Sequence, residues 1–360
     1  MLENCRWLLY LSRFYGCHPH TINERSVFTN FRLLTVYSFI ACGMYCVTAY
    51  YSFDFNTFCV ANSVECVLRR INQYNRTLYM ILTTLLSYVR HSQFERALIT
   101  SRKFDDLIQH QCRDINNEQK KRYIQWLIIL LIIGAWFLFG VLEKFVIKET
   151  ENMTNELTIQ YTMRILFSME IAKFCFLYDA LRRRFRHINK LCHKLIGKSI
   201  SVDISLFDAD HSIIVNIQRL HQCLNDATNH LTSYYSPQLF CWITCMLLDI
   251  ITCIFKALYG SNSVLLVCGQ CVMLLYLSLQ LLTISRICDL TCDQANALTS
   301  MIFSVEVSTF NHNKFWTEAI ELGVFLQAHP IHIRVCGLFN LDSRFTFFGN
   351  WYFIYFYHVF

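Results

Sequence analysis

The sequence predicts an all-α membrane protein with seven transmembrane helices, a cytoplasmic N-terminus, an extracellular C-terminus and long cytoplasmic helical extensions. Hydrophobic residues fill 54% of its 360 positions and charged residues only 16%, whereas a soluble domain carries about 25% charge. Runs of about 20 mostly apolar residues, the length that crosses a bilayer, recur along the chain. Between these runs Lys and Arg gather in alternate loops, the distribution that the positive-inside rule describes.

Each predicted span is an apolar run, and all seven belong to one domain that covers residues 1–360. The third, "YIQWLIILLIIGAWFLFGVLE", is the clearest, while the second is short and polar at both ends and the fourth carries charges. The last offers 16 residues, which at about 1.5 Å each give about 24 Å against a hydrocarbon core of about 30 Å. In order, the predicted spans are 33–53, 77–93, 123–143, 159–181, 238–258, 263–285 and 345–360.

The basic residues orient these spans. About 24 Lys and Arg residues lie before the first span or around the loops after the second, fourth and sixth, against about 6 in the other loops. The acidic loop after the third span contains the sequon N-M-T, so Asn152 is a candidate glycosylation site on the outer face. The inner loops are long and carry apolar residues at helical spacing, for example Ile217, Leu220 and Leu224. We therefore expect cytoplasmic helices that form a bundle with enough apolar surface to bind other copies of the chain.

Charged residues inside spans are costly and usually face the protein interior. Glu170 and Lys173 in the fourth span are three residues apart on one helix face, so they can pair. That pair is either structural or one polar wall of a ligand cavity. Arg164, near the outer mouth of the same span, either snorkels or lines the cavity. Asp249 in the fifth span has a ligand or ion role, or bonds to a neighbouring helix such as the one that bears Arg164.

Aromatic and amide side chains gather in the outer halves of the spans. An apolar, aromatic pocket with a few polar groups is the usual way in which proteins hold small molecules. Aromatic residues in membrane helices also serve as packing or interface residues, and this alternative stays open. The candidate ligand-binding residues are Tyr79, Trp136, Tyr161, Arg164, Asp249, Gln270 and Tyr276.

No sequence motif supports an enzyme. The chain has no HExxH, no GxSxG and no glycine-rich phosphate-binding loop. Its CxxC, Cys268 to Cys271, lies inside an apolar run, without the second ligand pair or the βαβ context that a zinc or redox site needs. No cluster of metal ligands and no basic stripe with interleaved aromatic residues stands out. We expect no cofactor, no metal and no nucleic-acid partner.

Seven spans first suggest a G-protein-coupled receptor, but the charge bias places both ends on the opposite sides, and the Asp-Arg-Tyr and Asn-Pro-x-x-Tyr motifs are missing. The segment "HPIHIRVCGLFNLD" at 329–342 contains a Gly-Leu-Phe-x-Leu-Asp block, "YYSPQLF" occupies 234–240, and the N-terminal region contains "LYLSRFYGCHPH". Through these stretches the chain resembles, over essentially its full length, the insect gustatory receptor family of the insect chemoreceptor superfamily, which has the inverted orientation derived above. The block residues are Gly337, Leu338, Phe339, Leu341 and Asp342.

The C-terminus departs from the pattern of that family. The family usually closes with Thr-Tyr, five apolar residues and Gln-Phe, whereas this chain has Trp351-Tyr352, "FIYFY" and His358-Val359. Of these positions only Tyr352 is kept. Either the last helix is an atypical member or this end of the gene has decayed.

The resemblance implies a ligand-gated cation channel in the plasma membrane, built as a homo- or hetero-tetramer and opened by a small-molecule tastant. The last span of each subunit would line a central pore, and the cytoplasmic helices would join the subunits. Helical spacing places Trp351, Tyr355 and His358 on one face of that span, as candidate pore-lining residues, unless their polar tips only contact lipid headgroups. Three alternatives stay open: a metabotropic receptor that signals through a G protein, a degenerate or auxiliary receptor subunit, and an odorant receptor of the same architecture.

Overall fold

The computed structural model describes residues 9–10, 12–16, 31–54, 64–109, 127, 130–138, 140–141, 151–201, 207–259, 264–304 and 314–341. Every structural statement below refers to these residues. The predicted seventh span, 345–360, lies outside them, and so do Asp342, Trp351, Tyr352, Tyr355, His358 and the side chain of Asn152.

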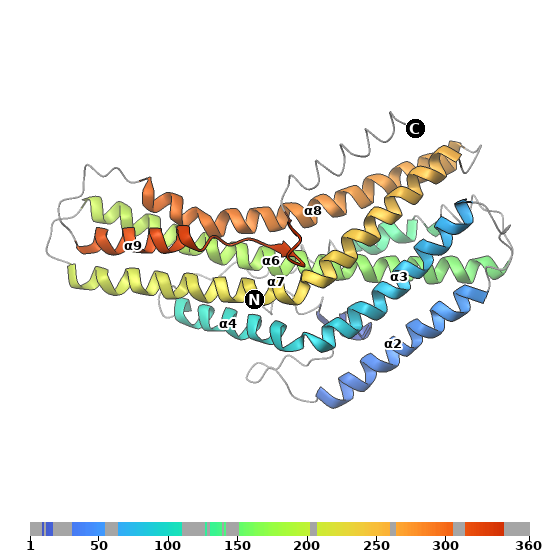
Figure 1. Ribbon diagram of the computed structural model, residues 1–360, viewed down its shortest axis with the longest axis horizontal. Helices are drawn as coiled ribbons and strands as arrows, with labels where there is room; N and C mark the ends of the chain where they lie inside the picture. The colour runs from blue at the N-terminus through green and yellow to red at the C-terminus, as the bar shows by residue number, and fades with distance from the viewer. Residues whose placement is uncertain are drawn as a thin grey trace.

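The described chain is built almost wholly from long helices that lie side by side (Figure 1). Helix breakers are scarce, with 3 Pro and 10 Gly in the whole sequence, so that single helices reach more than 50 residues. α6, α7 and α8 run along most of the molecule, with α2 and α3 at one end and α4 and α9 at the other (Figure 1). The elements are α2 (Phe31–Asp54), α3 (Val64–Val89), α4 (His91–Gln109), α6 (Glu151–Ser201), α7 (Phe207–Tyr259), α8 (Val264–Phe303), α9 (Lys314–Ala328), β1 (Arg334–Val335) and β2 (Phe339–Asn340).

The helices extend well past several of the predicted spans. α6 and α7 continue beyond 159–181 and 238–258, as the helical spacing of the adjoining residues predicts. The second predicted span, 77–93, differs from the structure, because α3 ends at Val89 and the chain turns at Arg90 before α4 begins. The predicted span 33–53 falls within α2, and the span 123–143 surrounds the helical residues 130–138. The span 263–285 coincides with the first part of α8, which begins one residue later, at Val264.

A short hairpin is the one departure from the all-α class among the described residues. β1 and β2 are antiparallel, with Val335 opposite Phe339. The turn between them has positive φ at Cys336 (48°) and Gly337 (72°), and the N–H of Leu338 donates to the carbonyl of Val335 at 2.9 Å. Positive φ at both central residues is the type I′ pattern of tight hairpins. The Gly-Leu-Phe-x-Leu-Asp block therefore begins in this turn.

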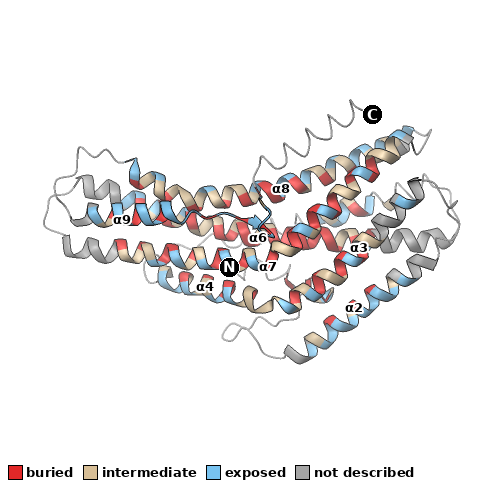
Figure 2. Ribbon diagram, viewed as in Figure 1, coloured by how far each residue is buried: buried red, intermediate tan, exposed pale blue. Residues whose placement is uncertain are grey.

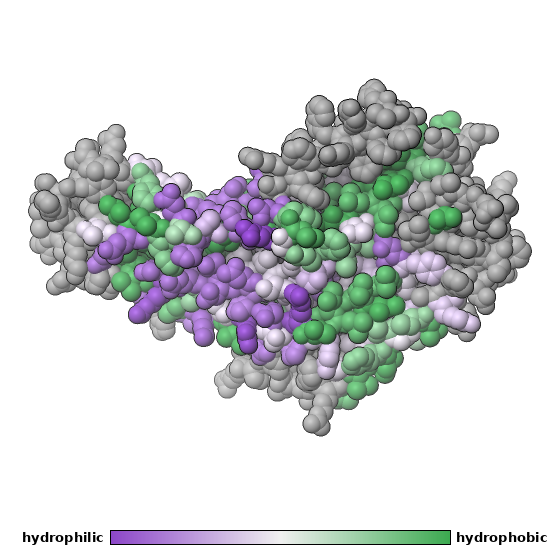
Figure 3. Space-filling model, viewed as in Figure 1, coloured by the Kyte–Doolittle hydropathy of each residue, from purple (hydrophilic) through white to green (hydrophobic). Residues whose placement is uncertain are grey.

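Hydropathy divides the molecule into two ends. Along α8 the exposed side chains are apolar as far as Leu282, and charged ones begin at Arg286. Figure 3 shows hydrophilic side chains gathered over α4 and its surroundings, and hydrophobic ones gathered toward the end where α2, α3 and the first part of α8 lie. We define the apolar half as α2, α3, residues 130–138, 161–181 of α6, 238–258 of α7 and 264–285 of α8, and the polar half as the rest.

The exposed side chains of the apolar half are suited to lipid rather than to water. Leu33 is 75% exposed, Phe137 71% and Val264 78%. Exposed apolar surface on this scale marks an interaction with membrane or protein. Among the described residues, two stretches are long and apolar enough to cross a bilayer, Ile214–Leu258 and Val267–Phe303, and two shorter apolar stretches are Thr35–Thr48 and Thr77–Val89.

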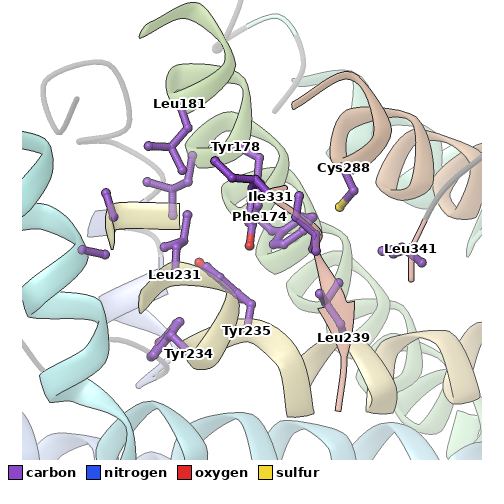
Figure 4. Close-up of a cluster of buried hydrophobic side chains, with 14 of the residues drawn as sticks. Phe174, Tyr178, Leu181, Leu231, Tyr234, Tyr235, Leu239, Cys288, Ile331 and Leu341 are labelled. Carbon is purple, nitrogen blue, oxygen red and sulfur yellow. The ribbon is translucent and has the colours of Figure 1, made fainter. Parts of the chain in front are cut away.

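One core of buried side chains continues through both halves (Figure 2). It is densest where α6 meets α7, where Phe174, Tyr178, Tyr235 and Trp242 are all 0% exposed. Figure 4 shows Phe174 and Tyr178 of α6 close to Tyr235 of α7, and the rings of Phe174 and Tyr235 meet edge-on with centroids 5.1 Å apart. Such edge-to-face pairs add stabilisation beyond their buried area.

The polar half has a core of its own helices, as the helical spacing predicts. Leu220 and Leu224 of α7 are buried, and so are Phe185 and Ile188 of α6. These positions repeat every three or four residues, so each helix presents one apolar face to its neighbours. The predicted bundle is confirmed as a packed structure, while its cytoplasmic location stays a prediction.

His221 of α7 makes the polar half sensitive to acid. Burial lowers the pKa of His221, because the imidazolium would lose its hydration, and the hydrogen bond from Nε2 to the carbonyl of Ala295 (3.1 Å) offsets this only in part. The unfolded chain therefore takes up a proton, at its ordinary pKa of about 6.5, before the folded chain does. Stability is full above that pH and falls below it. Melting temperatures measured from pH 7.5 to 5.5 should decline less for His221→Gln than for the native protein, with the exposed His193→Gln as control.

Gly323 lets α9 pack closely on the end of α8. A Cβ at this position would lie 3.0 Å from Cγ2 of Ile302 and 3.1 Å from Cζ of Phe303. Ile302 is buried and cannot easily move. Overpacking costs about 1–3 kcal/mol, against a gain in helix propensity of about 1 kcal/mol, so Gly323→Ala should lower the free energy of unfolding by about 1 kcal/mol. Gly269→Ala, in α8 with no atom within 4 Å of the added Cβ, is the control and should cost nothing.

Candidate ligand-binding site

Three helical segments bring a group of aromatic and polar side chains together inside the apolar half. The indole Nε1 of Trp136 donates to Oγ of Ser168 at 2.9 Å, and Nε2 of Gln280 donates to the same oxygen at 2.9 Å. Gln280 Nε2 also donates to the hydroxyl of Tyr276 at 2.9 Å. Trp136 and Tyr276 meet edge-on, with ring centroids 5.0 Å apart. The Ser168 hydroxyl is therefore the centre of a small polar network between residues 130–138, α6 and α8.

Arg164 closes one side of this network. Its guanidinium carbon lies 5.2 Å from the ring centroids of both Trp136 and Tyr161, within the range of cation–π attraction. Its Nη1 also lies 4.0 Å from the sulfur of Met273. The guanidinium is thus held among aromatic and thioether groups, and a role of Arg164 in lining a ligand cavity stays a prediction.

Apolar side chains surround the network. Trp136, Tyr161 and Met273 belong to a buried cluster that is separate from the main core, together with Ile250, Cys253 and Leu277. We call this cluster, with Arg164, Ser168, Tyr276 and Gln280, the aromatic site. It combines apolar walls with a few convergent polar groups, which is how small-molecule sites are usually built.

One acceptor in the aromatic site has no donor. Oε1 of Gln280 is buried and makes no hydrogen bond with any described residue. A buried amide oxygen without a partner costs free energy, so this atom favours a ligand that brings an O–H or N–H group. The aromatic rings beside it favour an apolar or aromatic body for the same ligand.

The structure brings four of the seven predicted ligand residues together and places Tyr79 elsewhere, in the main core. Tyr79 lies in the main core, with its ring centroid 4.8 Å from that of Phe167. Asp249 is half-buried on α7 beside Ile250, which packs on the aromatic site, and Gln270 is half-buried one turn from Met273. The four that meet are Trp136, Tyr161, Arg164 and Tyr276.

Two polar residues of the site, Ser168 and Gln280, are missing from the sequence-based prediction, as are the apolar residues Ile250, Cys253, Met273 and Leu277. Each of the two polar residues lies four residues after a predicted one, Ser168 after Arg164 and Gln280 after Tyr276, and so on the same helix face. Helical spacing alone would have found both polar residues.

A second polar group in the apolar half confirms the predicted pair of Glu170 and Lys173. The two side chains form a salt bridge and are only 4% and 1% exposed. Ser12 joins them, donating to Oε1 of Glu170 at 2.6 Å and accepting from Nζ of Lys173 at 3.0 Å. The predicted salt bridge is therefore confirmed, and a role of the pair as one wall of a ligand cavity stays a prediction.

Ser12 reaches this pair because the N-terminal segment 12–16 is held against α2. The hydroxyl of Tyr45 donates to the carbonyl of Tyr15 at 2.7 Å. Gly16 has φ of 76°, and a Cβ there would lie 2.5 Å from Cβ of Ala41. Only glycine fits both the positive φ and the close approach to α2.

These features define a helical membrane protein with an internal aromatic site. A sequence model of the 7tm chemosensory receptor family matches residues 5–348. The chain therefore belongs to the chemosensory receptor family, and the predicted membership of the insect chemoreceptor superfamily is confirmed. No curated protein sequence matches it.

Solved structures of an insect olfactory receptor, OR5 from Machilis hrabei, have a similar fold. For one of them the TM-score is 0.64 at 13% sequence identity, covering 98% of this chain and 96% of the other. A structure of the same receptor in complex with eugenol gives a TM-score of 0.62 at 14% identity, with the same coverage. Identity this low shows a shared fold and nothing finer.

Proposed function

We propose that this chain is a subunit of a ligand-gated cation channel of the plasma membrane, opened by a small-molecule tastant. Seven spans, a cytoplasmic N-terminus, an extracellular C-terminus and a homo- or hetero-tetramer are parts of this proposal. The observation that supports it best is the aromatic site, a small-molecule type of site inside the apolar half of a chemosensory receptor. The taste assignment follows the resemblance of the C-terminal block, and odorant reception is its alternative.

The aromatic site suggests the chemistry of the ligand. Trp136 and Tyr276 offer ring edges and faces, and the open Oε1 of Gln280 offers an acceptor. A small aromatic molecule with one hydroxyl or amine donor matches both features. Eugenol, the phenol bound in the similar olfactory receptor structure, is therefore a reasonable first probe.

Ligand binding opens a channel only if the open state binds more tightly than the closed one. The aromatic site touches α6 through Ser168 and α8 through Gln280, so a ligand that enters it bears on both helices. In the proposed channel this change reaches the last span, residues 345–360, whose Trp351, Tyr355 and His358 are the proposed pore-lining residues.

Gln280→Leu should weaken the response to a hydroxyl-bearing aromatic probe. The substitution keeps the side-chain size and removes both the acceptor for the ligand and the donor to Ser168. One lost hydrogen bond of about 1.4 kcal/mol corresponds to about tenfold in the half-maximal concentration. The measurement is cation current, or calcium entry, in cells that express the chain at equal surface density, with eugenol and small phenols applied in series.

Thr283→Val is the matched control for Gln280→Leu. Thr283 is an exposed residue of α8 whose hydroxyl bonds only within its own helix, to the carbonyl of Leu279 at 2.7 Å. It should leave the half-maximal concentration unchanged. Equal shifts for the two variants would show that the aromatic site does not bind the probe.

An epitope tag at the C-terminus separates the channel from its alternatives. Staining of intact cells places the end of the last span outside and excludes the G-protein-coupled arrangement. Staining only after permeabilisation, in protein that reaches the surface, removes the pore assignment of residues 345–360. A surface-expressed chain with an external tag and no current when alone indicates an auxiliary subunit.

A further inference from the structure

Helix α7 contains a proline at the boundary between the two halves. Pro237 lies inside the helix, and α7 changes direction near the middle of the molecule, where the two halves meet (Figure 1). Proline has no N–H, so it cannot donate to the carbonyl four residues earlier, and its ring also pushes that carbonyl away. That carbonyl belongs to Ser233. The bend in α7 therefore leaves one backbone acceptor without its helical donor.

A side chain from another helix supplies the missing donor. The guanidinium Nη1 of Arg90 donates to the carbonyl oxygen of Ser233. Arg90 lies in the turn that separates α3 from α4, where its own carbonyl accepts from the N–H of Gln93 at 3.0 Å. A charged donor makes a stronger hydrogen bond than a neutral one. Two irregular points of the backbone, the turn after α3 and the bend in α7, are thus joined by one contact.

Neighbouring side chains hold the same two points in register. The hydroxyl of Tyr234 donates to Oγ of Ser87 at 3.1 Å, and Nδ1 of His230 lies 2.8 Å from Oε1 of Gln93. Ser87, Arg90 and Gln93 follow one another at three-residue spacing around the turn. Arg90 lies between these two contacts, opposite the carbonyl that Pro237 releases. Its position is therefore fixed by packing on both sides.

The residue before the proline connects the bend to the C-terminal hairpin. Oγ of Ser236 donates to the carbonyl of Arg334 at 3.2 Å and accepts from the N–H of Cys336 at 2.5 Å. The hairpin ends at Asn340, a few residues before the predicted last span, 345–360. A change in the bend at Pro237 would therefore move the strand that leads into that span.

We propose that Arg90 is a positioning residue: its guanidinium takes the place of the donor that Pro237 lacks, sets the bend of α7, and through Ser236 sets the position of the hairpin 334–340. The effect on a pore rests on the function proposed above. The effect on the hairpin does not depend on that function, because it runs from Arg90 through α7 and Ser236 to the hairpin and involves no pore.

Hydrogen–deuterium exchange on the purified full-length protein tests this assignment. Arg90→Met should speed exchange of the amides in 331–341 by about tenfold, the factor that one lost hydrogen bond gives in a local opening equilibrium. Arg96→Met, an exposed arginine six residues along on α4, is the control and should leave that exchange unchanged. A role that is only structural at the α3–α4 turn would speed exchange near residue 90 and not in the hairpin.

Pro237→Ala provides the sharper comparison, since alanine restores an N–H that can donate to Ser233. In that background Arg90→Met should no longer speed exchange in the hairpin. An equal effect of Arg90→Met with proline and with alanine, or no effect with either, overturns the proposal. Should Pro237→Ala not fold, Arg90→Lys decides, because it keeps a charged N–H donor and should exchange more slowly than Arg90→Met; equal exchange for the two overturns the proposal. None of these readouts depends on current, so a silent channel would not alter the result.

Discussion

Lys173→Met is expected to lower the free energy of unfolding by about 3–5 kcal/mol, the usual cost of removing one partner from a buried ion pair. Lys173 is 1% exposed and forms its salt bridge with Glu170 in the interior of the apolar half. Methionine fills nearly the same volume, so the loss comes from the charge that is left behind. Among the described residues, the carboxylate of Glu170 would keep only Ser12 as a partner, which donates at 2.6 Å.

The double variant Glu170→Gln with Lys173→Met should recover much of that loss. Replacing both charges removes the unpaired ion, and the glutamine amide that takes the place of the carboxylate can still bond to Ser12. The comparison is made on the melting temperature of the protein in detergent and on its surface expression. If the double variant is no more stable than Lys173→Met, the argument from an unpaired charge is wrong.

The pair of Arg286 and Asp289 supplies a control of the same spacing. These side chains are also three residues apart, with a distance of 3.3 Å, but Arg286 is 58% exposed. Water screens such a pair, so Arg286→Met should cost about 0–1 kcal/mol. The contrast between the lysine variant and the arginine variant isolates burial as the cause.

Periodicity in the sequence is enough to predict the helices and part of the aromatic site. Long apolar runs with few Pro and Gly leave no other regular structure for most of the chain, and α2, α6, α7 and α8 appear where the runs are. Trp136 and Tyr276 are predictable as candidates because a large aromatic ring with one polar atom suits a small-molecule site, but the same criterion also selects packing residues. Arg164 is predictable because a charge inside a span must find partners.

The sequence does not predict which segments far apart in the chain contact one another. Tyr79 is a tyrosine in a predicted span like Tyr276, yet it packs on Phe167 in the main core, because the direction of a ring depends on how α3 crosses α6. The docking of Ser12 on Glu170 spans 158 positions of sequence, and no local pattern marks it. The turn at Arg90 breaks no periodicity and contains neither Pro nor Gly, so the predicted span 77–93 runs through it.

Trp242→Ala is the second substitution with a large expected effect, a loss of about 3–5 kcal/mol. Trp242 is fully buried where α7 meets α3 and α6, with ring centroids 5.6 Å from Phe174 and 5.9 Å from Tyr235. Neighbouring helices cannot collapse into the space that alanine leaves, because the surrounding rings are held by contacts of their own. The lost contacts are therefore not replaced.

Trp242→Phe should lower the free energy of unfolding by only about 1 kcal/mol. This substitution keeps an aromatic ring in the core but removes the indole N–H. The indole Nε1 of Trp242 is buried and has no hydrogen-bond partner among the described residues. Phenylalanine removes this unsatisfied donor, and that gain offsets part of the smaller ring's weaker packing. Melting temperatures of both variants test this, with the exposed Phe240→Ala on the same helix as control, which should change stability by no more than about 0.5 kcal/mol. If both variants lost the same free energy of unfolding, the indole N–H would contribute to stability, and the argument that the core needs only the aromatic ring would be wrong.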